Sequence, residues 1–207
     1  MVLLVATLAS LPVAVLAPLF APDVEGDVVA EPLLDPAAFY REDPVADAAR
    51  NMAVAHIPGT PLLPTPVAGL NQVQTNYAYI IVEVARRMDL PERAMVVAII
   101  TALQETRLRN LANPKVPASL RLPHDGTGTN FDSVGLFQQR PSMGWGTVPQ
   151  LMDPAQSAAR FYAKLVKVRN WQQLSVGGAA QAVQRSAFGG AYAKHTLQAE
   201  KIVDKLG

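Results

Sequence analysis

The sequence predicts a mainly α-helical domain over residues 69–207, and three stretches carry this prediction. In residues 72–88 the apolar side chains recur three and four positions apart, which is the spacing of one face of an α-helix. Residues 94–100 include no polar side chain, which is typical of a helix buried on every side. Residues 153–156, Asp-Pro-Ala-Gln, indicate a capping box with proline at the first helical position, and an apolar stripe follows it.

The remaining elements of the domain follow in chain order. Pro91 is expected to open the buried helix, which becomes polar at residues 104–107. Residues 111–145 hold many Gly, Pro, Asn and Asp residues, so they predict a long ordered loop, in which a small β-hairpin stays an open alternative. Two further helices are expected near residues 176–186 and 191–206, on either side of two adjacent glycines.

Two segments are expected before this domain. Residues 2–20 carry no charge and are about long enough to cross a bilayer, so residues 1–22 predict an export signal or a membrane anchor. No basic residue precedes the run, and two prolines would kink a spanning helix. The small residues Ala17 and Ala21 are candidates for a cleavage site, but proline follows each of them, so whether the segment is removed stays open. Ten of the 17 prolines lie in the first 66 residues, and residues 23–68 therefore predict a semi-rigid spacer that holds the domain away from a membrane.

Composition narrows the possible functions. The chain has 207 residues, no cysteine and a formal net charge of +1. The lack of cysteine excludes disulfides, thiolate metal sites and cysteine nucleophiles, and the near-neutral charge argues against binding to a nucleic-acid backbone. The three histidines, His56, His124 and His195, are far apart in the sequence, so neither a metal nor a cofactor is expected. An acid–base enzyme that uses carboxylates and a binding domain both remain.

The candidate for chemistry is Glu105, at the end of the buried helix. Burial among apolar side chains and the negative end of a helix dipole both disfavour the charged carboxylate and raise its pKa. A carboxyl group that stays protonated near neutral pH can donate its proton to the leaving group of a glycosidic bond. The alternative is a structural glutamate paired with Arg107 or Arg109.

Further motifs surround this glutamate in a definite order. QETRL at residues 104–108 is followed, 30 positions after Glu105, by Gly135 in the turn SVGLFQQRP. Together with LPERA, ALQETRL, SVGLFQQRPSMGWGT, FYAKL and AAQAVQRSAF, this order resembles the lytic transglycosylase branch of the lysozyme-like superfamily, in a variant found in bacterial cell-envelope proteins. The resemblance covers about residues 70–205 and implies a lysozyme-like helical fold.

The resemblance also implies roles for single residues. Glu105 matches the general acid of the family, and Thr106 stands where the family has a serine that supports this acid. Gly135 permits close approach of a sugar ring, and Gln138 matches the glutamine that hydrogen-bonds the substrate or the acid. The other implied substrate contacts are Phe137, which replaces a methionine, Gln139, and Trp145, for which burial in the core is the alternative to stacking on a sugar.

In two respects the catalytic set differs from the usual pattern. The later Tyr-Asn-Ala-Gly motif of the family is absent, and the nearest stretch, residues 182–186, has no tyrosine to touch the catalytic site. Most glycosidases also use a second carboxyl group. Asp132 is the candidate for it if water is the acceptor, and Asp125 lies in the same loop; the alternative for both is a role in forming turns.

Three functions remain to be weighed. The first is cleavage of the β-1,4 bond between N-acetylmuramic acid and N-acetylglucosamine in peptidoglycan strands, outside the cytoplasm, with residues 2–20 directing export or anchoring the chain in the membrane. The second is a non-catalytic peptidoglycan-binding or scaffold domain of an envelope-spanning assembly, which the absent tyrosine favours. The third is a membrane-tethered helical interaction module whose cleft holds no sugar.

Overall fold

A computed structural model describes residues 64–185 and 190–207. The predicted signal or anchor at residues 1–22 and most of the predicted spacer lie outside this part. The described residues form helices and contain no β-strand, which confirms a mainly α-helical domain. In place of the hairpin that the loop left open, two isolated bridges form within these ranges, between Ala112 and Thr127 and between Val134 and Gln139. None of the described helices is both long and apolar enough to cross a membrane.

The first two helices form where the apolar pattern predicts them. Helix α2 spans Gln72–Arg87 and begins with a capping box, in which the side chain of Asn71 accepts the backbone N–H of Gln74 while the Gln74 side chain accepts the N–H of Asn71. Helix α3 spans Glu92–Thr106 directly after Pro91 and is buried over most of its length. Its burial follows from the apolar run, which offers no face to solvent.

Of the two helices in the middle of the domain, the sequence predicts one and misses the other. Helix α5 spans Pro154–Leu165, and the Asp153 carboxylate accepts the backbone N–H groups of Ala155 and Gln156, as the cap motif predicts. Before it lies helix α4, Val148–Met152, which was not predicted. Five residues are too few to display a helical period, so no apolar pattern marks this helix.

The last two helices are shorter than predicted. Helix α6 spans Val176–Gln184, and helix α7 spans Thr196–Leu206. The chain does not continue as helix back to residue 191, because Tyr192 buries its ring and a tight 3-10 turn, Ala193–His195, follows before α7 begins. Three other short 3-10 turns occur in the described ranges, at Ser119–Arg121, Pro141–Met143 and Trp171–Gln173.

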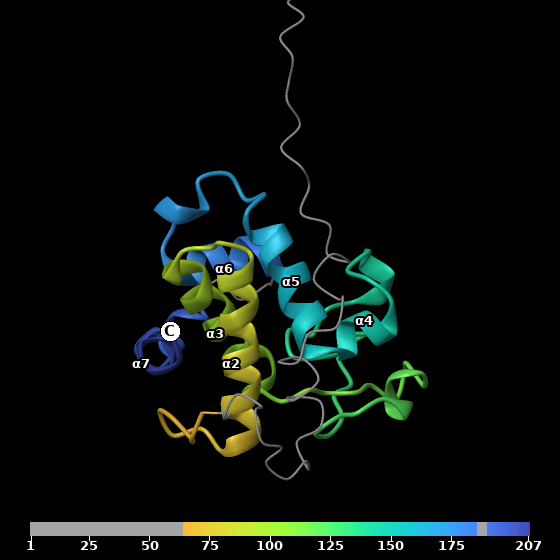
Figure 1. The fold of residues 1–207 in the computed structure, drawn as a ribbon. Coiled ribbons are helices and arrows are strands. Elements are labelled where there is room, and N and C mark those ends of the chain that lie inside the picture. Colours follow the sequence, from red (N-terminus) through yellow and green to blue (C-terminus); the bar gives the residue numbers. More distant parts are fainter. Residues whose placement is uncertain (1–63, 186–189) are drawn as a thin grey trace, which may run out of the picture. The chain divides into compact units, whose positions relative to one another are not determined.

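Helix α3 lies at the centre of the packed helices. It contacts α2, α5, α6 and α7, whose apolar faces therefore cover it on several sides (Figure 1). Trp171 belongs to the same apolar core, as its position after a helix end suggests. Helix α3 is buried from Ala94 to Leu103, and in its last turn the side chains of Gln104 and Glu105 are partly exposed.

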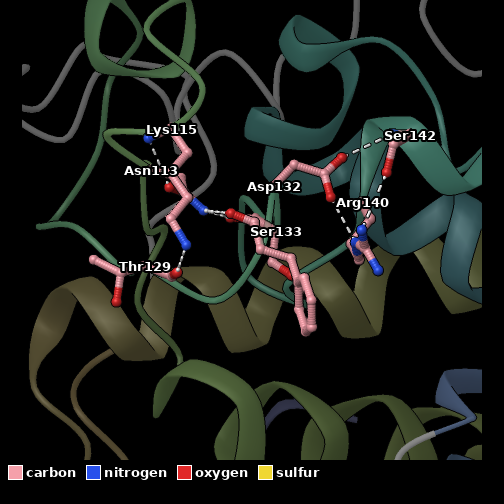
Figure 2. A network of polar contacts seen from close by, with 8 residues as sticks. Asn113, Lys115, Thr129, Asp132, Ser133, Arg140 and Ser142 are labelled. Atoms are coloured by element: carbon pink, nitrogen blue, oxygen red, sulfur yellow. Dashed lines mark hydrogen bonds and ion pairs between the residues drawn. The ribbon is translucent and has the colours of Figure 1, made fainter.

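The predicted ordered loop between α3 and α4 is held by side-chain amides. The amide nitrogen of Asn113 donates to the carbonyl oxygens of Phe131 and Ser133, each at 3.0 Å. The ammonium group of Lys115 donates to the carbonyl of Thr129 across the same loop (Figure 2). These bonds join residues 14 to 20 positions apart, so side chains as well as short 3-10 turns and isolated bridges order the loop.

Candidate active site

The candidate site begins where α3 stops. Arg107 and Leu108 both have left-handed backbones, with φ of 56° and 55°, and the Leu108 N–H reaches back to the carbonyl of Ala102. From α2, the side chain of Gln74 donates to the carbonyl of Arg107 at 2.8 Å. The helix therefore ends sharply just after Glu105, and two consecutive non-glycine residues in this conformation mark a place where backbone strain is held by the surroundings.

The Glu105 side chain lines a cavity at this end of α3. The cavity, called here the Glu105 cavity, has a volume of about 430 Å³. Its lining is mostly polar and comes from α2, the end of α3 and the residues that follow: Gln74, Gln104, Glu105, Thr106, Arg107, Arg109 and Leu111.

The surroundings of the Glu105 carboxyl decide its charge. Partial burial raises the pKa of Glu105, and a hydrogen bond from the Tyr192 hydroxyl, 2.7 Å from Oε1, opposes part of that rise. The alternative in which Glu105 is an ion-pair partner of Arg107 or Arg109 does not occur among the described residues. The carboxyl group is thus suited to hold a proton at a pH where an exposed glutamate has lost it.

Tyr192 belongs to the candidate site through its bond to Glu105, and the sequence did not single it out. It lies 87 positions after Glu105, in the stretch Gly190-Ala191-Tyr192-Ala193, and its ring is 1% exposed. The family resemblance directs attention to residues 182–186, where no tyrosine occurs. A tyrosine two positions after a pair of glycines was the one sequence feature that could have indicated a site residue here. Its contact with Glu105 arises only because α3 packs against the turn before α7.

Removal of the Tyr192 hydroxyl tests its role. In Tyr192→Phe the hydrogen bond that favours the carboxylate is lost, so the pKa of Glu105 rises further and the alkaline limb of any cleavage-rate profile moves to higher pH. The rate at the optimum is expected to fall about tenfold, as the loss of one hydrogen bond to the ionised acid implies. Tyr162→Phe is the matched control, because that hydroxyl donates to the carbonyl of Ile81 inside the core. An unchanged pH profile in Tyr192→Phe would contradict the assignment.

Thr106 joins the end of α3 to the turn that contains Gly135. Its hydroxyl donates to the carbonyl of Leu136 at 2.9 Å and is also 3.1 Å from the carbonyl of Ala102. The same oxygen accepts the backbone N–H of Arg109 at 3.2 Å. The turn after Gly135 therefore lies against the residue next to Glu105, although 30 positions separate the two segments.

The Thr106 bond can be tested against a second threonine in the same helix. Thr106→Val leaves the buried carbonyl of Leu136 without its partner and is expected to lower the free energy of unfolding by about 2 kcal/mol. Thr101→Val is the control, because the Thr101 hydroxyl bonds only the carbonyl of Val97 within the helix and its loss should change stability by about 0.5 kcal/mol or less. Urea unfolding of both variants gives the comparison. Equal losses would mean that the bond to Leu136 has no special weight.

Three predicted substrate contacts instead support the turn. The prediction that Phe137 faces a sugar is wrong, because its ring is fully buried and stacks on Phe161 with 4.9 Å between centroids. Gln139 is also buried and donates to the carbonyl of Ser157. At Gly135, with φ of 79°, the closely approaching neighbour is the carbonyl of Leu151, which a β-carbon would overlap. The glycine is therefore required by the packing of its own chain.

Gln138 and Trp145 line a different cavity from Glu105. The Gln138 amide donates to the carbonyl of Gly135 at 3.2 Å and makes no bond to the acid. For Trp145 the core alternative holds, since the indole is 9% exposed and the Lys164 ammonium lies 3.5 Å from its ring centroid. This ring face is already occupied by a cation and is not open for stacking on a sugar.

The two loop carboxylates have structural partners. Asp132 accepts from the Arg140 guanidinium at 2.5 Å and from the backbone N–H of Ser142 at 2.9 Å (Figure 2). Partial burial would raise the pKa of Asp132, but these hydrogen bonds outweigh it and hold the pKa well below its usual range. Asp125 accepts the backbone N–H of Asn110. Neither aspartate lines the Glu105 cavity, so the described residues place one carboxyl group there.

Comparison with known proteins adds no assignment. No protein-family model matches the chain, and no curated protein matches it. Within the described ranges no group of three or more acidic or histidine side chains is placed to hold a metal ion. The geometry around Glu105 and the order of the sequence motifs are therefore the features of the chain that point to a function.

Proposed function

We propose that the protein cleaves the β-1,4 bond between N-acetylmuramic acid and N-acetylglucosamine in peptidoglycan, with Glu105 as general acid and then as base. The observation that carries the proposal is the partly buried Glu105 carboxyl, held by Tyr192 at the opening of a 430 Å³ cavity. The ordered motifs around it support a lysozyme-like fold and this substrate class. The Tyr192 contact supplies a tyrosine at the glutamate, which residues 182–186 lack, and so supports a catalytic role over a non-catalytic binding domain.

The chemistry needs only one carboxyl group. Glu105 gives its proton to the bridging oxygen, the bond from the muramyl C1 to this oxygen breaks, and positive charge develops on the muramyl ring. The resulting carboxylate, stabilised by the Tyr192 hydroxyl, then takes a proton from the muramyl 6-hydroxyl as that oxygen attacks C1. Glu105 recovers its proton and the product is an anhydro sugar.

Capture by water is the competing outcome of the same first step. It would give a hydrolysed product and usually involves a second carboxylate. Because Asp132 is already bonded to Arg140 and Ser142 and lies outside the Glu105 cavity, the internal route is favoured. The proposed enzyme works outside the cytoplasm, with residues 2–20 directing export or anchoring the chain and residues 23–68 as the spacer.

A wall digest tests the proposal and the product together. The full chain, purified in a mild detergent, is incubated with peptidoglycan sacculi between about pH 4.5 and 8, and the soluble muropeptides are identified by mass spectrometry. Anhydro products are expected. Retention of the protein on sacculi without release of any muropeptide would instead identify a non-catalytic binding or scaffold domain, and neither retention nor release would favour an interaction module without a sugar ligand.

A further inference from the structure

A second cavity lies beside the turn that contains Gly135, and it is rich in cations. Its volume is about 490 Å³. We call it the basic cavity, because four of its lining residues are lysines or arginines and none is acidic. The residues that line it are Gln138, Arg140, Met143, Trp145, Lys164, Lys167, Val168, Ala182, Val183, Gln184 and Arg185.

Three of these cations have no acidic partner. Arg140 is paired with Asp132, but Lys164, Lys167 and Arg185 form no ion pair with any described carboxylate. Burial, followed by the charges of Arg185 and Lys167, lowers the pKa of Lys164, in agreement with the grouping of these three cations on the cavity lining. An anion bound among these cations would gain from their combined positive potential.

The uneven charge of the chain agrees with this local excess. Residues 64–207 carry 16 lysines and arginines against nine aspartates and glutamates, whereas the first 63 residues carry two against eight. The near-neutral total therefore conceals a basic domain. An anionic ligand would be drawn to this domain as a whole and then to the basic cavity, where three of its cations meet.

A cation–π contact and hydrogen bonds to backbone carbonyls hold the lining of the cavity in place. The Lys164 ammonium rests on the Trp145 ring, and the Trp145 carbonyl accepts from Arg160 at 3.2 Å. From α6 the side chain of Gln184 donates to the carbonyl of Phe137 at 2.8 Å. The Phe137 carbonyl follows directly after the Leu136 carbonyl that Thr106 binds, so the basic cavity and the Glu105 cavity adjoin the same turn.

We propose that the basic cavity binds the carboxylate groups of the peptide that a peptidoglycan strand carries. This inference rests on the proposed function and names a second part of the same substrate. The cavity lies next to the turn whose Leu136 carbonyl accepts from Thr106, the neighbour of Glu105 in the chain. A glycan in the Glu105 cavity would therefore carry its attached peptide close to this turn and to the cations beside it. Met143, Val168 and Val183 give the cavity an apolar share, which suits a peptide better than a phosphate polymer.

Binding of the free peptide tests this inference without any cleavage. The probe is a fluorescent tetrapeptide of the wall type, L-alanine, D-glutamate, a diamino acid and D-alanine, with its carboxylates free, titrated with the full chain. The double variant Lys167→Gln/Arg185→Gln is expected to bind it at least about tenfold more weakly. Lys201→Gln/Lys205→Gln removes the same charge from an exposed face of α7 and should change the affinity by less than about twofold.

Several results would overturn the inference. These are equal loss of affinity in both double variants, equal binding of the peptide with its carboxylates converted to amides, and displacement of the peptide by inorganic phosphate or by DNA at lower concentration than by free peptide. The outcome is also separable from that of the cleavage assay. Peptide binding without wall cleavage would refute only the proposed function, and wall cleavage without peptide binding would refute only the basic cavity.

Discussion

Glu105→Gln is expected to slow the release of soluble muropeptides from sacculi by about a thousandfold, since positioned acid–base groups contribute on that order. Glutamine keeps the size of the side chain and an oxygen that can accept the Tyr192 hydroxyl, but it has no proton to donate. The initial rate of muropeptide release, followed by mass spectrometry, gives the comparison with the unmodified chain. A variant that cleaves sacculi as fast as the parent would refute Glu105 as the acid.

The same substitution should have the opposite effect on stability. Burial raises the pKa of Glu105 in the folded chain, so its contribution to stability is present at low pH and is lost as the pH rises through the raised value. Glutamine cannot ionise. The variant should therefore match the parent below about pH 4 and exceed it by about 1 kcal/mol at pH 8, within the range common for replaced active-site groups.

Urea unfolding at pH 4 and pH 8 provides this second measurement. It also shows whether an inactive Glu105→Gln chain is folded, so loss of cleavage cannot be ascribed to unfolding. A variant that is less stable at both pH values would mean that the carboxylate is satisfied in the folded chain and that burial does not govern its pKa.

Gly135→Ala is the substitution expected to damage the fold most. At φ of 79° an alanine is strained by about 1 kcal/mol, and its β-carbon would also overlap the backbone carbonyl of Leu151. Backbone atoms cannot move aside as a flexible side chain does, so overpacking adds about 2 kcal/mol more. The free energy of unfolding is expected to fall by about 3 kcal/mol.

The chain offers a matched control for this effect. Gly144 has nearly the same backbone, with φ of 69°, but nothing lies within 4 Å of the place where its β-carbon would be. Gly144→Ala should thus show the conformational strain alone, about 1 kcal/mol. Urea unfolding of both variants isolates the contribution of the Leu151 contact, and equal losses would show that the overlap is relieved by a small shift.

Most of the helices could be predicted because their signals are local. The apolar spacing before Met88, the apolar run in α3 and the cap at Asp153 each lie within a few turns of chain. The short α4 has too few residues for a period. The start of α7 depends on where the Tyr192 ring packs. This packing is a property of the folded chain, and no pattern in the neighbouring residues predicts it.

The residues of the candidate site also differ in whether a local sequence pattern predicts them. Glu105 and its place at a helix end could be found from the sequence, since a buried run that turns polar is a local pattern. The tyrosine that bonds it could not, because 87 residues separate the two. The motif predicts Phe137 and Gln139 as ligand contacts, since it gives the identity of a residue but not the direction of its side chain. In the folded chain both side chains are buried.

The two consecutive carbonyls at Leu136 and Phe137 have a consequence for how the protein would respond to its ligands. The Leu136 carbonyl accepts a hydrogen bond from Thr106 of α3, and the Phe137 carbonyl accepts one from Gln184 of α6. This single stretch of backbone is therefore hydrogen-bonded to both helices. A ligand in one cavity that displaced this stretch of backbone would change the shape of the other cavity. The affinities of the two cavities would then be coupled, and by reciprocity each ligand would change the affinity for the other by the same factor.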